Sequence, residues 1–241
     1  RSLLFACSLL AAVPALAQQE QPRFGIDFSG FVKTDVMFDS RQTVAAREGH
    51  FLLYPAPGLD DRFGSDVNAK ANFNILSIQT RLTAKISGPE AFGAKSSALF
   101  EGEFFGTSDA DISGFRVRHA FVKLDWAKPS LLIGQYWHPM FVAEMYPGVV
   151  SFNTGAPFQP FARNPQVRLG YNIDKVRLIA AAISQRDFPS NGPAGLTSAY
   201  LRNTAVPNLH AQAQYTSGGH LFGLGVDWKM LTPRLVTTRN V

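Results

Sequence analysis

Residues 76–86 read Leu-Ser-Ile-Gln-Thr-Arg-Leu-Thr-Ala-Lys-Ile, and every second side chain, counted from Leu76, is apolar or threonine. The positions between them carry serine, glutamine, arginine, threonine and lysine. Successive side chains of a β-strand point to opposite faces of its sheet. The segment therefore predicts a strand with one apolar face and one polar face.

The same period of two recurs along the chain and predicts nine strands. They span residues 26–38, 71–87, 95–106, 115–126, 131–137, 164–174, 176–187, 208–217 and 221–230. The pattern changes phase within 115–126, where Arg116 and Arg118 fall in register with Ala120, and a β-bulge near His119 would restore it. Segment 176–187 begins apolar on both faces, so its orientation stays open.

The predicted connections alternate between short and long. Segments 88–94, 127–130, 174–176 and 218–220 are short, whereas 39–70, 107–114, 138–163 and 188–207 are longer. Outer-membrane barrels have short turns at one end and long loops at the other. Charged residues make up only 17% of the chain, and no apolar run beyond its first residues approaches a membrane helix. We therefore predict an all-β, antiparallel transmembrane β-barrel.

The first 17 residues have the composition of a secretory signal peptide. Arg1 precedes a short apolar stretch, and Ala15-Leu16-Ala17 provides a cleavage signal before polar Gln18. The alternative, a buried N-terminal helix, fits poorly with this abrupt change. A lipoprotein signal at Cys7 fits poorly too, because the residues that follow it are mostly apolar. Cleavage would remove the single cysteine and with it any thiol chemistry.

Three stretches resemble the Gram-negative outer-membrane porins, of the general and DcaP-like types. They are Gly30-Phe31-Val32-Lys33-Thr34-Asp35, Gly134-Gln135, and the run from Trp137-His138-Pro139 to Thr154-Gly155-Ala156-Pro157-Phe158-Gln159-Pro160-Phe161-Ala162-Arg163. Porins of this kind fold the loop after the fifth strand into the barrel, and the strand count puts residues 138–163 in that position. The resemblance thus implies that 138–163 is a constriction loop.

The resemblance also implies that residues 18–241 are the N-terminal part of a larger barrel, with about nine of some 16 strands. It implies outer-membrane lipid, the barrel-assembly machinery and two further copies of the chain as partners. The expected function is passive diffusion of small polar solutes or ions across the outer membrane of a Gram-negative bacterium. The alternatives are a secreted soluble β-sandwich binding module and an outer-membrane enzyme.

Charged side chains on the polar faces are the candidate site residues. The pore-lining candidates are Lys33, Asp35, Arg81, Lys85, Glu101, Glu103 and Arg168, and the constriction-loop candidates are Glu144 and Arg163. Cations along a permeation path would lower the energy of a passing anion, although structural ion pairs are an equal alternative. We expect Glu101 and Glu103 to be solvated lumen acids rather than the acid pair of a hydrolase.

Nothing in the sequence indicates catalysis, a cofactor or a metal site. The five histidines show no metal-ligand spacing. The net charge of +5 is mild, and lysine and arginine alternate with acids, whereas nucleic-acid-binding proteins cluster their cations. We therefore predict no enzyme activity, no cofactor, no bound metal and no nucleic-acid partner.

Overall fold

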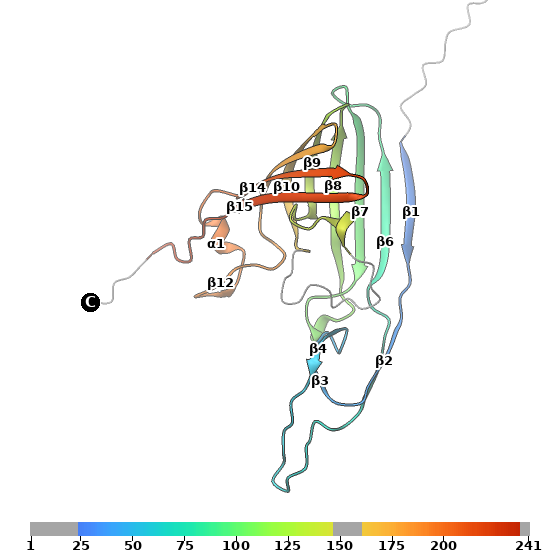
Figure 1. Ribbon diagram of the computed structural model, residues 1–241, viewed down its shortest axis with the longest axis vertical. Coiled ribbons are helices and arrows are strands. Elements are labelled where there is room, and N and C mark those ends of the chain that lie inside the picture. Colours follow the sequence, from blue (N-terminus) through green and yellow to red (C-terminus); the bar gives the residue numbers. More distant parts are fainter. Residues whose placement is uncertain (1–23, 147–160, 237–241) are drawn as a thin grey trace, which may run out of the picture.

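The computed structural model describes residues 24–146 and 161–236. Its main element is a nine-stranded antiparallel sheet in the order β1-β6-β7-β8-β9-β10-β11-β14-β15 (Figure 1). The strands are β1 (Gly25–Phe31), β6 (Thr80–Ser87), β7 (Lys95–Phe104), β8 (Phe115–Asp125), β9 (Pro129–Trp137), β10 (Arg163–Ile173), β11 (Val176–Ile183), β14 (Asn208–Ser217) and β15 (His220–Trp228). The predicted all-β antiparallel class is confirmed. The predicted signal peptide, residues 1–17, lies outside the described part.

Each of the nine predicted strands corresponds to one strand of this sheet, but two of them are interrupted. Segment 26–38 divides into β1 and β2 (Asp35–Asp39), and segment 71–87 divides into β5 (Asn72–Leu76) and β6. β2 and β5 pair with each other as a separate small sheet that extends away from the main one (Figure 1). The break before β6 lies at Gln79, whose φ of 67° is incompatible with a continuous strand.

The structure also resolves the two segments whose facing the sequence left open. Glu101 lies opposite His119 and Gly102 opposite Val117, so Arg118 is an extra residue in β8, and this is the predicted bulge. In β11, Ile179 is buried whereas Leu178 is exposed. Apart from Arg177, both faces of β11 are apolar, but the strand keeps the regular alternation of its neighbours.

Short and long connections are separated to opposite ends of the sheet. Segments 88–94, 126–128, 174–175 and 218–219 join strands at one end, and 32–79, 105–114, 138–162 and 184–207 join them at the other. The longer segments contain β3 (Thr43–Ala46), β4 (Phe51–Pro55), η1 (Asp109–Asp111), η2 (Ala143–Met145), β12 (Asn191–Gly192), β13 (Gly195–Leu196) and α1 (Ala199–Arg202). The predicted alternation of connection lengths is confirmed.

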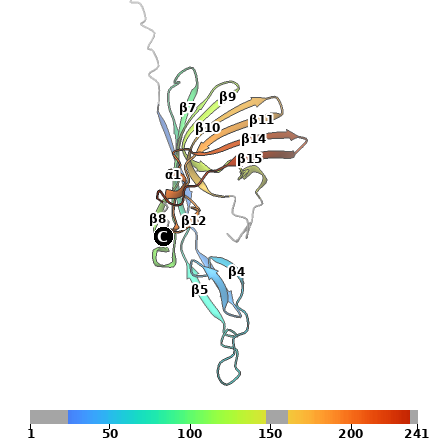
Figure 2. The same cartoon turned by 90° about the vertical axis from the view of Figure 1, so that its left-hand side faces the viewer.

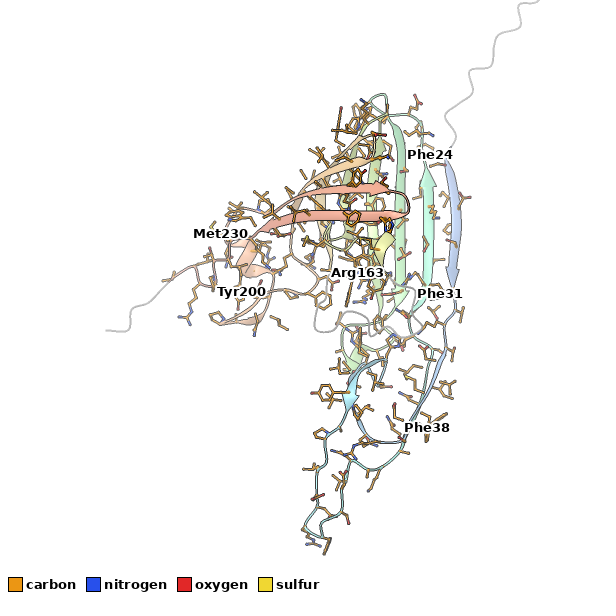
Figure 3. All side chains as sticks on the ribbon, in the orientation of Figure 1. Phe24, Phe31, Phe38, Arg163, Tyr200 and Met230 are labelled. Atoms are coloured by element: carbon orange, nitrogen blue, oxygen red, sulfur yellow. The ribbon has the colours of Figure 1, made fainter. Side chains whose placement is uncertain are left out.

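The sheet exposes apolar side chains on one face and buries polar side chains on the other. The exposed face includes Phe28, Leu82, Val122, Leu169, Leu178, Leu209 and Leu224. The opposite face includes buried Thr83, Glu103, Arg118, Gln166, His210 and Gln212. The sheet curves strongly (Figure 2). Side chains on β10 and β7, which are not neighbours, meet on the polar face, so this face is the concave one. Phe24 and Phe31 lie near the two ends of β1 (Figure 3).

A small apolar core lies near the junction of the main sheet with the small β2–β5 sheet. Leu76, Ile78 and Phe105 form it, with partly buried Met37, Phe51 and Ile112 packed against it. Ile78 is 3% exposed, whereas Leu82 is 48% exposed. The prediction that Ile78 and Leu82 share one apolar face of a continuous strand is therefore wrong, because the chain turns at Gln79 between them.

The described strands form an open, curved sheet with β1 and β15 at its two edges. The exposed face is apolar along the strands, and the concave face carries the polar groups. No helix in the described ranges is long and apolar enough to cross a membrane.

Candidate pore-lining site

Four arginines surround two glutamates on the concave face, and we call this group the arginine cluster. It consists of Arg81, Arg116, Arg118, Arg163, Glu101 and Glu103. Four strands contribute: β6, β7, β8 and β10. The bulge in β8 permits this arrangement, because it places both Arg116 and Arg118 on the side of the glutamates.

Both carboxylate oxygens of Glu103 are occupied by guanidinium groups. Oε1 lies 3.1 Å from Arg116 Nη2 and 3.4 Å from Arg163 Nη1. Oε2 lies 2.8 Å from Arg118 Nη1 and 3.1 Å from Arg81 Nη2. The Glu103 side chain is 0% exposed, so the expectation of a solvated lumen acid is wrong for this residue. Its charge is offset by the arginines instead of by water.

Glu101 makes a second set of contacts beside Glu103. Arg118 Nε donates to its Oε1 over 2.6 Å, and the Thr83 hydroxyl donates to its Oε2 over 2.9 Å. Arg118 and Arg163 also lie over the Trp137 ring, each with its guanidinium carbon 5.4 Å from the ring centroid. These contacts hold the arginines against the concave face of the sheet. With four arginines and two glutamates, the cluster carries more positive than negative charge.

The other predicted pore-lining residues lie in three places. Arg168, on β10, donates from Nε to Gln166 Oε1 over 2.9 Å and stacks over the Tyr136 ring. Lys85 is exposed on β6, opposite Asp27 of β1. Lys33 and Asp35 form an ion pair at the junction of β1 and β2, and Asp35 also lies 3.5 Å from His50. The structure thus joins Arg81, Glu101 and Glu103 but not the remaining four.

The two predicted constriction-loop residues have different surroundings. Glu144 is exposed within η2. Arg163 is the first residue of β10 rather than the end of the loop, and it is buried in the arginine cluster, where its Nε also lies 3.4 Å from Asp187 Oδ2. Residues 147–160, the middle of the predicted loop, lie outside the described part.

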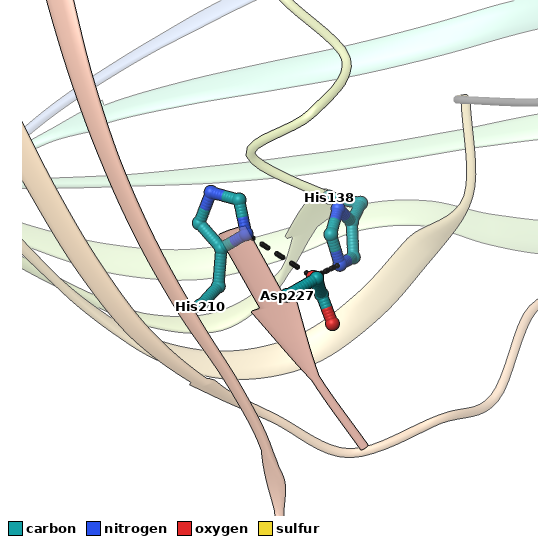
Figure 4. A group of neighbouring side chains, drawn as sticks. All are labelled: His138, His210 and Asp227. Atoms are coloured by element: carbon teal, nitrogen blue, oxygen red, sulfur yellow. Dashed lines mark hydrogen bonds and ion pairs between the residues drawn. The ribbon is translucent and has the colours of Figure 1, made fainter. Parts of the chain in front are cut away.

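The first residue of that loop, His138, contacts the last two strands of the sheet on its concave face. Its Nε2 lies 2.8 Å from Asp227 Oδ2 on β15, and His210 Nδ1 on β14 lies 3.1 Å from the same oxygen (Figure 4). His138 directly follows β9, three strands away from β14 in the sheet order. Burial lowers the pKa of the His138 imidazole, although the Asp227 carboxylate acts in the opposite direction.

Sequence reasoning missed five residues at these two sites: Arg116, Arg118, His138, His210 and Asp227. The phase change in β8 already signalled the first two, since a bulge there turns both arginines toward Glu101 and Glu103. No sequence signal pointed to the other three. They come from three separate segments that only the curvature of the sheet brings together.

Comparison with known proteins bears on the fold. No family model and no curated protein matches the sequence. The structure is similar to that of the outer membrane channel DcaP of Acinetobacter baumannii, with a TM-score of 0.59 and 19% identity, over 85% of this chain and 53% of DcaP. A loop L8 deletion mutant of the Vibrio cholerae outer membrane protein OmpT matches with a TM-score of 0.37 and 12% identity, over 88% of this chain and 72% of OmpT. This chain spans about half the length of DcaP. It has the fold of the matched half of that outer-membrane β-barrel channel.

Proposed function

We propose that the protein lets small polar solutes or ions diffuse passively across the outer membrane of a Gram-negative bacterium, through a water-filled barrel. The observation that carries this proposal is the distribution of side chains on the sheet, which exposes apolar side chains on one face and has charged side chains on the concave face. Lipid suits the exposed face and water suits the concave one. The fold shared with the DcaP channel supports the same conclusion.

Spanning a membrane requires that the edges of β1 and β15 be paired, because unpaired backbone groups are costly in hydrocarbon. Outer-membrane lipid, the barrel-assembly machinery and two further copies of the chain are the partners that the proposal implies. Residues 138–163 would narrow the lumen. The contact of His138 with Asp227 supports this, because it holds the start of the segment against the concave face.

The arginine cluster and Arg168 favour anions over cations as permeating ions. Guanidinium groups near the path lower the energy of an anion and raise that of a cation. An enzyme that uses Glu101 and Glu103 is less well supported. Both oxygens of Glu103 already contact arginines, and Glu101 contacts Arg118 and Thr83, so neither carboxylate is placed to reach a substrate.

Planar-bilayer recording of the purified full-length protein tests the proposal. We expect stepwise, ohmic conductance and a reversal potential in a potassium chloride gradient that indicates chloride preference. Arg168→Glu should shift this potential toward cations, and the shift should shrink at high salt as screening increases. Lys175→Glu, in the β10–β11 turn, is the matched control and should have little effect. A protein that extracts without detergent and gives no conductance would instead support the soluble binding module.

A further inference from the structure

His138, His210 and Asp227 form a second polar group on the concave face, separate from the arginine cluster. His210 and Asp227 lie directly opposite each other on the paired strands β14 and β15. His138 approaches from the end of β9, and all three side chains point toward one another (Figure 4). Two neighbouring strands thus supply two of the groups, and the segment that follows the central strand β9 supplies the third.

Two of the three distances between the ligand atoms are close to those around a tetrahedral metal ion. One ring nitrogen each from His138 and His210 and one carboxylate oxygen of Asp227 all lie within 4.8 Å of one another. An ion with bonds of about 2.0–2.2 Å holds its ligand atoms roughly 3.3 Å apart. The two nitrogen–oxygen distances, 2.8 and 3.1 Å, are already near this value. Small rotations of the side chains would therefore admit an ion.

Around the three residues, one side chain is fully buried and another is accessible to solvent. The His210 side chain is 0% exposed, and its Nε2 has no hydrogen-bond partner among the described residues, so its polar contact is with Asp227. Asp227 is 28% exposed. A cavity of about 310 Å³ adjoins the group and is lined by His138 and Asp227 together with Asn164, Gln185 and Asn208. It offers space for water molecules that complete the coordination of an ion.

We propose that His138, His210 and Asp227 bind a divalent transition-metal ion. Two imidazoles and one carboxylate suit zinc, nickel or copper, whereas magnesium and calcium prefer sites made of oxygen atoms. The ion would tie the segment after β9 to β14 and β15. This proposal does not depend on the transport function, since binding is measurable whether or not the protein conducts.

The competing explanation is a hydrogen-bonded histidine–aspartate–histidine group that binds nothing. The test uses the full-length protein without an affinity tag, purified in detergent, stripped with a chelator and titrated with zinc chloride by calorimetry. We expect one zinc ion per chain. His210→Gln and Asp227→Asn should each weaken binding at least tenfold. His220→Gln, an exposed histidine at the start of β15, should leave it unchanged.

Heat-dependent gel mobility establishes that each variant is folded. If His210→Gln or Asp227→Asn fails to fold, X-ray absorption at the zinc edge of the wild-type protein still decides the question, because two imidazole ligands are expected. Absence of stoichiometric binding by the wild-type protein would overturn the proposal. Fewer than two imidazoles at the ion, or equal weakening by His220→Gln, would overturn it as well.

Discussion

Glu103 is the residue on which the arginine cluster depends, because all four arginines of the cluster contact its carboxylate. Glu103→Gln removes this charge and leaves the guanidinium groups to repel one another in a buried setting. Breaking a buried ion pair from one side costs about 3–5 kcal/mol. We expect a loss of that size in the free energy of unfolding, measured by urea denaturation in lipid vesicles. Glu90→Gln, at an exposed residue of the 88–94 turn, should change it little.

His50 makes the packing of the 39–70 segment sensitive to pH. The residue is 6% exposed and contacts Phe51 and Phe105. Burial, together with Lys33 and Arg47, lowers the pKa of His50, while Asp35 and Glu103 act in the opposite direction. The folded form therefore binds a proton less readily than the unfolded form, whose pKa is about 6.5. Stability from this packing is complete above that pH and is lost as the pH falls below it.

Hydrogen exchange of residues 43–55, corrected for the intrinsic rate, should thus show weaker protection at pH 5.5 than at pH 7.5. In His50→Gln the difference should largely disappear, whereas His220→Gln should retain it. A variant at position 50 that responds to pH as the wild type does would contradict the assignment.

At the scale of the strand, adjacent residues of β14 point to opposite faces of the sheet. Ala213 is exposed on the apolar side and Gln214 is half-buried on the concave side. Arginine at the midplane of a lipid-facing surface costs roughly 2–4 kcal/mol. Ala213→Arg should therefore reduce the fraction of protein that assembles in the outer membrane, as measured by fractionation and heat-dependent gel mobility. Gln214→Arg should assemble normally, and equal defects in both variants would argue against a lipid-facing side.

At the scale of the whole molecule, segment 138–163 determines the width of the lumen if it folds inward. Removing residues 147–156 from the full-length protein keeps His138 and its contact with Asp227. The single-channel conductance should rise, because less of the lumen is filled, while the barrel still assembles. Removing residues 57–64 from the tip of the long 32–79 connection is the control and should leave conductance close to that of the wild type. Unchanged conductance in the 147–156 deletion would place the constriction elsewhere.

The sequence by itself determined the nine strands, their antiparallel connections and the facing of most side chains. These properties are local, since an alternation such as that of residues 80–86 sets the direction of each side chain along a strand. The change of phase in residues 115–126 also predicts the bulge in β8, in which Arg118 is the extra residue.

Only the tertiary structure decided which of those side chains meet. Arg163 contacts Glu103 across two intervening strands, and His138, which follows the central strand β9, reaches Asp227 on β15 across three. Such contacts depend on sheet curvature and on the path of the chain after β9, which alternation along one strand does not encode. The burial of Ile78 likewise follows from the turn at Gln79 and the packing of Phe105, and neither is encoded in the alternation of residues 76–86.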